Sequence, residues 1–375
     1  MIDGKPDSSA AGDGERFMKM ALRLARRARE RTWPNPMVGA VVVKNGRVLG
    51  QGYHRRAGQP HAEALALERA GKAARGSDLY VTLEPCHRHG RTGPCSELIH
   101  RAGIRRVFVG TLDPNPREQG RGIATLLRMG IKVETGLLAE ECRNLNEVYN
   151  VFIGGKRPFV HMKAAASLDG RIAAGSGDAR WISSKLARVH AHRLRSRSQA
   201  VMVGAGTVRK DDPRLDVRHL RGRNPAVVLL DPRLSVKPRA NIFRVERGAP
   251  VLVFCRSTAS GGMEKRLTGA GAEVIRVRSR RGEMPLEPVL AELLERGVYR
   301  LLVEGGSGVF GRLFSRRLVD RVDVIVAGCI LGSSGVPMVD MPGPPRVAAA
   351  PRLKGVTFKR LGDDMCISGS VSWPD

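Results

Sequence analysis

The sequence PHAEALALERAG at residues 60–71, with LYVTLEPCHRHGRTGPC at residues 79–95, decides how the first half of the chain is organised. The first segment begins with Pro, ends with Gly and carries apolar residues at helical spacing, so it predicts a helix. The apolar run that opens the second segment predicts a buried strand. A further amphipathic segment at residues 94–103 follows. The stretch therefore predicts a helix, a strand and a helix in succession.

Three side chains in this stretch, His61, Cys86 and Cys95, are suited to binding zinc. One imidazole and two thiolates supply three ligands of a tetrahedral site and leave the fourth position for water, as in catalytic zinc sites. Zinc lowers the pKa of its bound water to about 7, and a carboxylate can pass that proton to a leaving amine. Glu63 lies two residues after His61 in the first turn of the same predicted helix, so we expect it to be this proton shuttle.

The order H-x-E followed by P-C matches the signature of zinc nucleobase deaminases, which usually closes with C-x-x-C. Here the second Cys lies nine positions after the first. One alternative is that His61 only caps a helix while the two Cys side chains are buried or form a closed zinc site. His87 and His89 are competing ligands by their chemistry, although adjacent loop positions more often contact substrate or solvent. Four residue types in order on one helix–strand–helix frame favour the catalytic site.

The length of 375 residues predicts two domains, because single cores stop growing beyond roughly 250–300 residues. In the first half we expect a disordered tail at residues 1–14, an amphipathic helix at 15–31 and a hairpin that turns at Asn45-Gly46. Strands alternating with helices after this hairpin indicate a three-layered α/β sheet. The first domain spans residues 15–153, with a helical pattern at its end from 137 to 153, and GGKRP at 154–158 is the predicted boundary.

A second α/β series follows at residues 158–375. Its candidate strands are apolar runs at 159–166, 200–205, 226–231, 250–255, 300–306 and 322–328, and its candidate helices lie around 183–196, 288–297 and 307–318. EGGSG at 304–308 joins a strand to a helix, where glycines let backbone N–H groups approach a phosphate. No G-x-G-x-x-G fingerprint cleanly follows a strand, which disfavours a doubly wound dinucleotide fold.

The formal net charge of +28 allows two interpretations. It suits nucleic-acid binding, in which Lys and Arg neutralise phosphates, or it reflects Arg spread over solvated surfaces that also helps to attract a phosphorylated substrate. Basic residues are scattered along both halves and only 4% of residues are aromatic, which favours the second interpretation. We expect a small-molecule substrate and a homo-oligomer, without a specific nucleic-acid partner.

The cellular location of the protein can be predicted from the apolar runs, the N-terminal residues and the Cys content of the sequence. No run approaches the ~18 consecutive apolar residues that a membrane span requires. The N-terminal residues are polar, and the Cys content is far below that of disulfide scaffolds. We therefore expect a cytoplasmic protein with reduced thiols and no membrane association.

Further motifs make a family resemblance specific. In the first half TWPNPMVGAVVV (32–43), GYHRRAGQPHAEALAL (52–67), YVTLEPC (80–86), HGRTGPC (89–95), DPNP (113–116) and GRG (120–122) resemble the deaminase domain of the bifunctional riboflavin-biosynthesis deaminase/reductases. In the second half KAAASLDG (163–170), WIS (181–183), GAGTV (204–208), DDP (211–213) and VEGG (303–306) resemble the reductase domain of that family. The resemblance covers nearly the whole chain beyond the tail.

The resemblance implies a cytidine-deaminase-like α/β/α domain followed by a dihydrofolate-reductase-like α/β domain. Its activities are the zinc-dependent hydrolytic deamination of 2,5-diamino-6-(5-phosphoribosylamino)pyrimidin-4-one and an NADPH-dependent reduction of the ribosyl side chain to ribityl. The product is 5-amino-6-(5-phosphoribitylamino)uracil. The cofactors it implies are one Zn²⁺ per chain and NADPH.

The same resemblance assigns residues. It implies that His61, Cys86 and Cys95 bind zinc and that Glu63 is the proton shuttle. It also implies that Asn35, Asp113 and Asn115 contact the deaminase substrate. In the reductase domain, the residues that it implies to contact NADPH are Ala165, Trp181, Thr207, Asp211 and Gly306. Those that it implies to contact the reductase substrate are Arg195, Leu215, Arg218 and Glu304. The arginines are natural partners of a phosphate, because a guanidinium offers bidentate donors.

Two positions depart from the family pattern. Arg88 stands where the family usually has His, and we expect His87 or His89 to take over a substrate contact. Ala179 stands where the family can place a substrate-binding Ser. Two other functions compete: a nucleic-acid base deaminase with an accessory domain, against which the few aromatic residues argue, and a zinc-stabilised binding protein that has lost catalysis, against which the intact Glu63 argues.

Overall fold

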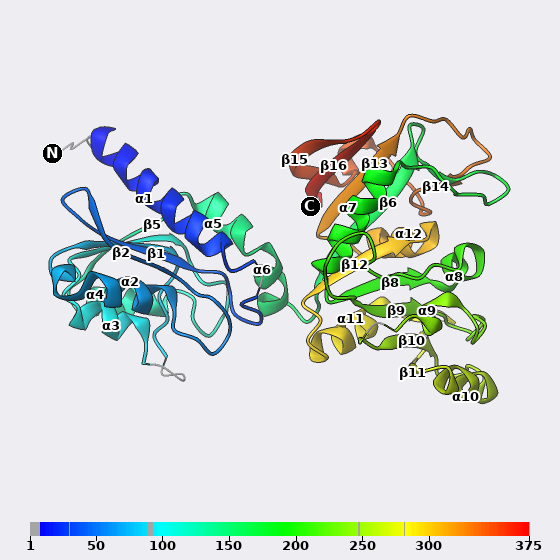
Figure 1. Ribbon diagram of the computed structural model, residues 1–375, viewed down its shortest axis with the longest axis horizontal. Helices are drawn as coiled ribbons and strands as arrows, with labels where there is room; N and C mark the ends of the chain where they lie inside the picture. Colours follow the sequence, from blue (N-terminus) through cyan, green and yellow to red (C-terminus); the bar gives the residue numbers. More distant parts are fainter. Residues whose placement is uncertain (1–7, 30, 89–92, 247, 281, 375) are drawn as a thin grey trace. The chain divides into compact units, whose positions relative to one another are not determined.

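The computed structural model describes residues 8–29, 31–88, 93–246, 248–280 and 282–374. The chain divides into two compact units, Met1–Lys156 and Arg157–Asp375 (Figure 1). No helix in the described ranges has both the length and the apolar character needed to cross a membrane.

The first unit is built on a five-stranded mixed sheet with the order β2-β1-β3-β4-β5. β1 is antiparallel to both of its neighbours, whereas β3, β4 and β5 are parallel to one another. The strands are β1 (Gly39–Lys44), β2 (Arg47–Tyr53), β3 (Asp78–Leu83), β4 (Arg106–Thr111) and β5 (Lys132–Thr135). The carboxyl ends of β3 and β4 therefore lie side by side at one edge of the sheet.

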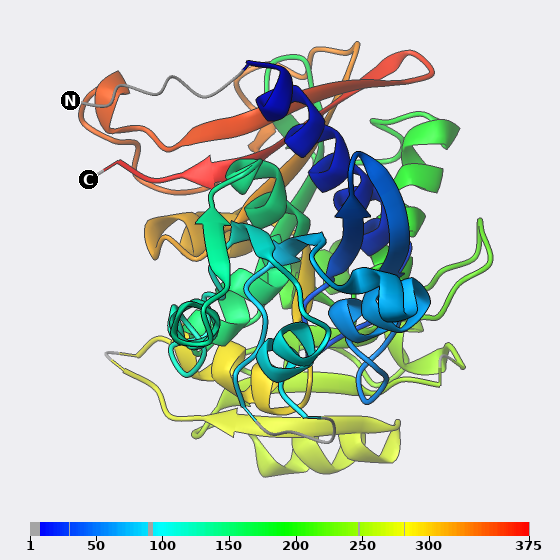
Figure 2. The same cartoon turned by 90° about the vertical axis from the view of Figure 1, so that its left-hand side faces the viewer.

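Helices cover both faces of this sheet, which confirms the predicted three layers. α1 (Ser8–Arg26) and α5 (Ala139–Leu145) lie on one face, and α2 (Ala62–Ala70), α3 (Cys95–Arg101) and α4 (Arg121–Arg128) lie on the other (Figure 1). Successive side chains of a strand point to opposite faces of the sheet. Val41 and Tyr80 pack with α1, while Val42 and Val81 pack with α2. Figure 2 shows α1, in dark blue, running beside the β1–β2 hairpin.

Two elements of this unit differ from the sequence prediction. Helix α1 begins at Ser8 instead of residue 15, and it ends at Arg26, before Arg29 adopts a φ of 49°. Residues 1–7 of the predicted tail lie outside the described ranges. The segment 137–153 forms two helices, α5 and α6 (Glu147–Gly154), because buried Asn146 between them accepts from Met37 N–H at 2.8 Å and donates to Met37 C=O at 2.9 Å.

The second unit contains a nine-stranded sheet with the order β11-β10-β9-β8-β12-β6-β13-β16-β15. The strands from β11 to β13 are parallel, and β16 and β15 extend the sheet as an antiparallel hairpin. The bounds are β6 (Phe159–Ser167), β8 (Ala200–Gly204), β9 (Ala226–Leu230), β10 (Val251–Arg256), β11 (Ala272–Val277), β12 (Arg300–Gly305), β13 (Arg321–Ala327), β15 (Arg352–Leu361) and β16 (Asp364–Ser372). A separate pair joins β7 (Arg171–Ala173) to β14 (Val336–Pro337).

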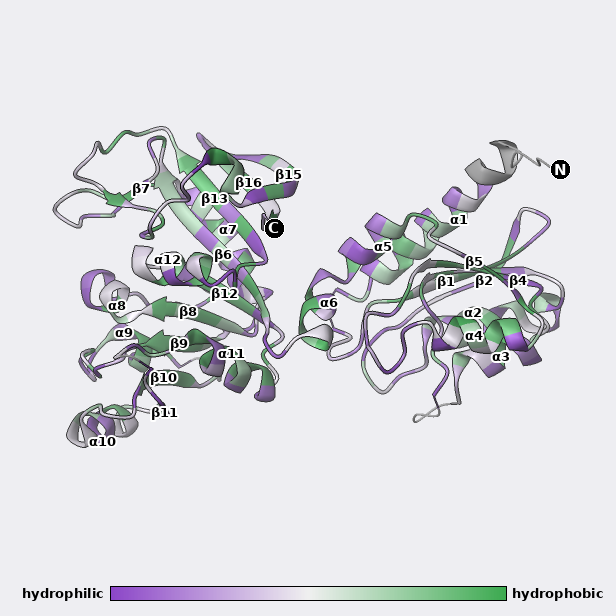
Figure 3. Ribbon diagram, turned by 180° about the vertical axis from the view of Figure 1, so that it is seen from behind, coloured by the Kyte–Doolittle hydropathy of each residue, from purple (hydrophilic) through white to green (hydrophobic). Residues whose placement is uncertain are grey.

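Helices again cover both faces. α7 (Lys185–Ser196), α8 (Ala205–Asp211), α9 (Asn241–Arg244) and α10 (Gly261–Gly269) contribute to one core cluster, and α11 (Leu286–Glu295) and α12 (Ser307–Ser315) to the other. Buried on both sides, β8, β9 and β10 are coloured as hydrophobic in Figure 3. Continuous apolar runs made these strands predictable, whereas β11, β15 and β16, which carry polar and exposed residues, were missed.

Candidate active sites

The three predicted zinc ligands meet at the edge of the first unit's sheet. His61 is the N-cap residue of α2, Cys86 follows β3, and Cys95 is the first residue of α3. The potential ligand atoms of these side chains all lie within 4.8 Å of one another. His61 Nδ1 is 3.3 Å from Cys95 Sγ and 3.6 Å from Cys86 Sγ.

This donor set fits a zinc ion. Tetrahedral zinc with ~2.3 Å bonds to sulfur and ~2.0–2.1 Å bonds to nitrogen places its ligand atoms roughly 3.5–3.8 Å apart. The distances from His61 Nδ1 to the two sulfurs are close to these separations. Three protein ligands leave a fourth position for water, so the geometry suits a catalytic rather than a closed site.

Glu63 projects from the first turn of α2 beside these ligands. Its side chain is buried, and burial raises its pKa, while the neighbouring His61 opposes that shift. A carboxyl group with a raised pKa exchanges a proton with its surroundings more readily near neutral pH. Helix α2 therefore supplies both a potential metal ligand and an acid–base group, two residues apart.

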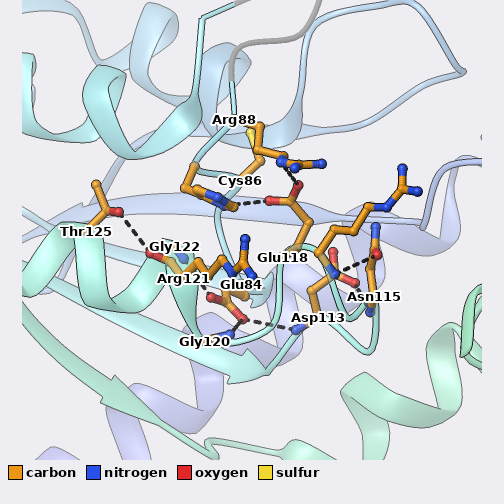
Figure 4. A network of polar contacts seen from close by, with 12 residues as sticks. Glu84, Cys86, Arg88, Asp113, Asn115, Glu118, Gly120, Arg121, Gly122 and Thr125 are labelled. Carbon is orange, nitrogen blue, oxygen red and sulfur yellow. Dashed lines mark hydrogen bonds and ion pairs between the residues drawn. The ribbon is translucent and has the colours of Figure 1, made fainter.

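Glu84, which the sequence analysis did not single out, organises the loops around this site (Figure 4). Its buried carboxylate accepts hydrogen bonds from four backbone N–H groups, those of Asp113, Gly120, Gly122 and Ile123, at 2.9–3.2 Å. Gly122 allows this close packing, because a Cβ there would lie 1.9 Å from Pro85 O. The carboxylate thus ties the start of α4 to the segment that carries Cys86.

Asp113 and Asn115 are held by this loop in a defined geometry. Asp113 Oδ1 accepts from the Asn115 N–H at 2.9 Å and from the Tyr149 hydroxyl at 3.0 Å. Burial raises the pKa of Asp113, and these two hydrogen bonds oppose the increase. Tyr149 lies on α6, so this contact joins the DPNP loop to the end of the unit's chain.

Asn35 is positioned by a histidine that the sequence analysis did not select. His54 Nδ1 lies 3.2 Å from Pro60 O, which only accepts, so this nitrogen carries the proton. Burial lowers the pKa of His54, so the ring is neutral and its Nε2 accepts from Asn35 Nδ2 at 3.1 Å. The Asn35 side chain, held by this hydrogen bond, lines the cavity described next.

These groups line one cavity of about 220 Å³. It contains every residue that the resemblance assigned to the deaminase substrate, together with the metal-site residues His61, Glu63 and Cys86. The full polar lining is Asn35, His54, His61, Glu63, Glu84, Cys86, Asp113, Asn115, Glu118 and Tyr149.

The histidines that competed as zinc ligands have other positions. His87 Nδ1 lies 2.9 Å from Glu118 Oε2, and His87 does not belong to the ligand cluster. Arg88, which replaces the usual His, is half exposed with its Nε 3.8 Å from Glu118 Oε1. His89 lies outside the described residues.

The second unit holds a larger cleft, of about 500 Å³, at the carboxyl ends of β6, β8 and β12. All nine residues that the resemblance assigned to NADPH or to the reductase substrate line this cleft. They are Ala165, Trp181, Arg195, Thr207, Asp211, Leu215, Arg218, Glu304 and Gly306. Ala179, at the position of the family's Ser, also lines it.

Glu304 lies buried at the base of the cleft. Arg195 Nε and Nη2 donate to its two carboxylate oxygens, and Lys163 Nζ lies 3.9 Å from Oε2. Burial opposes ionisation, but the charge of Arg195 outweighs it and lowers the pKa of Glu304 to about 2. Arg195 also donates to Asp216 C=O, so three of its ~5 N–H donors are already used. Its capacity to bind a phosphate is correspondingly smaller than the sequence suggested.

A second cavity, of about 610 Å³, shares Thr207, Asp211 and Gly306 with this cleft. It adds the start of α12, where backbone N–H groups favour an anion, and the basic residues Arg209, Lys210 and Arg312. Gly305 has a φ of 123°, which only glycine adopts without strain, at the turn from β12 into α12. An elongated cofactor with phosphates fits such a pair of joined cavities.

Another potential ligand group, His190, Asp323 and Cys366, is buried in the second unit. The Asp323 carboxylate already accepts from His161 at 3.0 Å and from His190 at 3.1 Å. We interpret this cluster as a hydrogen-bonded charge network of the core.

Comparisons with known proteins agree with this geometry. Residues 12–111 match the family model described as the cytidine and deoxycytidylate deaminase zinc-binding region, and residues 158–367 match the RibD C-terminal domain. The riboflavin biosynthesis protein RibD of Aquifex aeolicus is 40% identical over 352 residues, covering 94% of this chain and 96% of the relative. RibD of Escherichia coli is 36% identical over 366 residues, covering 94% of this chain and 98% of the relative.

Solved structures show the same similarity. A diaminohydroxyphosphoribosylaminopyrimidine deaminase/5-amino-6-(5-phosphoribosylamino)uracil reductase from Thermotoga maritima superposes with a TM-score of 0.80 at 37% identity, covering 97% of this chain and all of that one. Acinetobacter baumannii RibD in one crystal form gives 0.80 at 33% identity, covering 96% and 99%.

Fold, sites and similarities together define a bifunctional enzyme, a zinc-dependent deaminase joined to an NADPH-dependent reductase. The chain belongs to the RibD family of riboflavin-biosynthesis proteins. The predicted fold class, the two activities and the two cofactors are thereby confirmed.

Proposed function

We propose that the first unit deaminates 2,5-diamino-6-(5-phosphoribosylamino)pyrimidin-4-one by hydrolysis, with zinc held by His61, Cys86 and Cys95. When bound, the metal would supply an activated water. Glu63 takes a proton from the attacking water and returns it to the departing amino group, so that one ring C–N bond is replaced by C–O and ammonia leaves.

The pyrimidine is held by side chains of the same cavity. Asn35 offers its amide oxygen, whose orientation follows from the hydrogen bond to His54. Asp113 and Asn115 offer further polar contacts from the loop that Glu84 and Tyr149 hold. Because these partners are hydrogen-bonded in advance, substrate binding requires little reorganisation.

The second unit then reduces the ribosyl group of the deaminated product to ribityl. NADPH, which supplies the hydride, contacts Ala165, Trp181, Thr207, Asp211 and Gly306 in this proposal, and the sugar phosphate contacts Arg195, Leu215, Arg218 and Glu304. Lys163 lies in the same cleft, and burial lowers the pKa of its ammonium group. We assign to it the proton that the opened sugar ring gains as the hydride arrives at carbon.

The observation that carries the proposal is that one cavity contains His61, Cys86 and Glu63 together with Asn35, Asp113 and Asn115. The direct test uses the purified chain and the phosphoribosyl diaminopyrimidine, with and without NADPH. Ammonia release should not require NADPH, and NADPH oxidation should follow deamination. Absence of ammonia release from zinc-loaded protein would contradict the proposal.

We further propose a cytoplasmic homo-oligomer with a small-molecule substrate and no specific nucleic-acid partner. Both substrates carry a phosphate, to which the basic surface is electrostatically attractive. Such attraction is long-ranged and weakens with salt, so it does not require a nucleic acid as ligand.

A further inference from the structure

One carboxylate in the deaminase cavity has no role in the proposed reaction. Glu118 lines the cavity that contains Glu63 and Asp113, and its side chain is 17% exposed. Its backbone N–H donates to Asn115 C=O at 2.9 Å, so the residue sits in a turn directly after the DPNP segment. The side chain extends from this turn toward the segment that carries Cys86 and Arg88 (Figure 4). There its Oε2 lies 2.9 Å from Nδ1 of His87.

Each of the other carboxylates of the cavity already has a role in the proposed function or in holding the loops. Both oxygens of Glu84 accept backbone N–H groups, and Glu63 serves the proton transfer. Asp113 uses Oδ1 for Asn115 and Tyr149 and keeps Oδ2 for the substrate. In Glu118, Oε2 accepts from His87, whereas Oε1 has, among the described residues, only the ion-pair contact of 3.8 Å with Arg88. Glu118 Oε1 is thus an acceptor still able to take a hydrogen bond.

His87 determines how this acceptor is oriented. A carboxylate has no proton to give, so His87 Nδ1 is the donor in the 2.9 Å contact. The pair joins two loops that follow different strands, β3 and β4. His87 therefore positions Glu118 and does not need to touch the substrate itself.

The size of the cavity indicates which part of a substrate meets Glu118. At about 220 Å³ it is below the ~300–1,000 Å³ of pockets for drug-sized ligands, so it holds a base but not a whole phosphoribosyl compound. A carboxylate selects N–H donors and repels a phosphate. The N–H donors of the base that survive deamination are its remaining ring amino group, the N–H that joins the ring to the sugar, and its ring N–H groups.

We propose that Glu118, oriented by His87, determines the specificity of the deaminase by accepting a hydrogen bond from the pyrimidine amino group that is not removed. This inference rests on the proposed function and extends it to the choice of substrate. Glu118 selects diaminopyrimidines over bases that lack the second amino group, because a site built to bond an N–H rejects an analogue without it.

The test compares two substrates of the full-length, zinc-loaded chain: the phosphoribosyl diaminopyrimidine and its analogue without the 5-amino group. The wild-type enzyme should prefer the first in kcat/KM by about tenfold or more, as expected for one charge-assisted hydrogen bond. Glu118→Ala should reduce that ratio toward one, mainly through KM, and Glu118→Gln, which retains a carbonyl acceptor, should keep part of it. The kcat/KM ratio of His87→Ala should lie between those of the two Glu118 variants. His87→Asn, whose side-chain amide places a donor near the position of Nδ1, should restore the preference for the diaminopyrimidine.

Zinc content and reductase activity separate this role from a structural one. Both should stay at wild-type values in all four variants, and Glu134→Gln, which removes an exposed carboxylate of the same unit, should leave the ratio unchanged. An unchanged ratio in Glu118→Ala, or loss of zinc from the Glu118 or His87 variants, would overturn the inference. If the wild-type enzyme released ammonia from neither substrate, that result would instead contradict the proposed function.

Discussion

Arg195 and Glu304 form a two-point ion pair at the base of the reductase cleft, with Nε bonded to Oε1 and Nη2 to Oε2 at 2.9 Å. The partners come from α7 and β12, 109 residues apart in the sequence. Both side chains are nearly buried, at 11% and 8% exposure. The pair therefore links the substrate cleft to the packing of the unit.

This pair predicts a pH-dependent contribution to stability. The pKa of Glu304 is about 2 in the folded protein and lies near its ordinary value of 4.5 in the unfolded chain. A lowered folded-state pKa stabilises the fold fully above the unfolded value, and this stability is lost as pH falls from about 4.5 toward 2. The free energy of unfolding of the wild type should fall across that window.

Glu304→Gln tests the assignment. The variant should be destabilised at pH 7 by about 3–5 kcal/mol, the usual cost of breaking a buried ion pair. Its difference from the wild type should shrink toward pH 2, as followed by denaturant unfolding at several pH values. A constant difference across this range would contradict the role given to the charge of Glu304.

The zinc ligands predict metal content. Cys95→Ser should lose most of its zinc, because a serine hydroxyl is a much poorer ligand than a thiolate. Cys366→Ser is the matched control, since Cys366 is also buried beside a histidine but belongs to the other cluster. Elemental analysis should give one zinc per chain for the wild type and for the control. Full zinc in Cys95→Ser would remove Cys95 from the ligand set.

Glu63→Gln should stop deamination without removing the metal. Loss of a general acid–base group typically costs ~10²–10⁴ in rate, and the three proposed ligands remain. Ammonia release should therefore drop by this factor while zinc content stays constant. The variant should still oxidise NADPH when it is supplied with the deaminated intermediate.

Asp211→Asn is the corresponding test in the second unit, where the reductase and not the deaminase should lose activity. Asp211 lines both cavities of the reductase and is absent from the deaminase cavity. NADPH oxidation should fall and ammonia release should continue at the wild-type rate. If either this variant or Glu63→Gln lost both activities while folded, the two-site assignment would be wrong.

Glu84→Gln should lower the stability of the deaminase unit and its affinity for substrate, because Glu84 holds the loops around the cavity. The amide would place an NH₂ group against backbone N–H donors that now bond to the carboxylate, leaving buried donors unpaired at a cost of about 1–3 kcal/mol. We expect a lower melting temperature and a higher KM for deamination, with unchanged reductase kinetics. Differential scanning calorimetry and steady-state assays measure both, and a wild-type KM would contradict the positioning role.

From the sequence alone it was possible to predict the zinc motif, the helix–strand alternation of the first half, and six strands and three helices of the second half. Apolar runs and helical spacing report local burial, which is why β8, β9 and β12 were predicted close to their observed bounds. His61, Glu63, Cys86 and Cys95 were found because their spacing is itself the signal. Conversely, the polar strands β11, β15 and β16 and the break at Asn146 have no such periodicity.

The pairing of the polar groups in the deaminase cavity became visible in the three-dimensional arrangement of the loops. His54 with Asn35, Tyr149 with Asp113, and Glu118 with His87 are separated by 19 to 36 residues, and nothing in their local sequence states the pairing. The antiparallel β1–β2 hairpin places Asn35, which precedes β1, beside His54, which follows β2. The parallel strands β3 and β4 bring the loops that carry His87 and Glu118 to one end of the sheet. A buried polar atom there must find a hydrogen-bond partner, and the partner is whichever loop the sheet order places beside it.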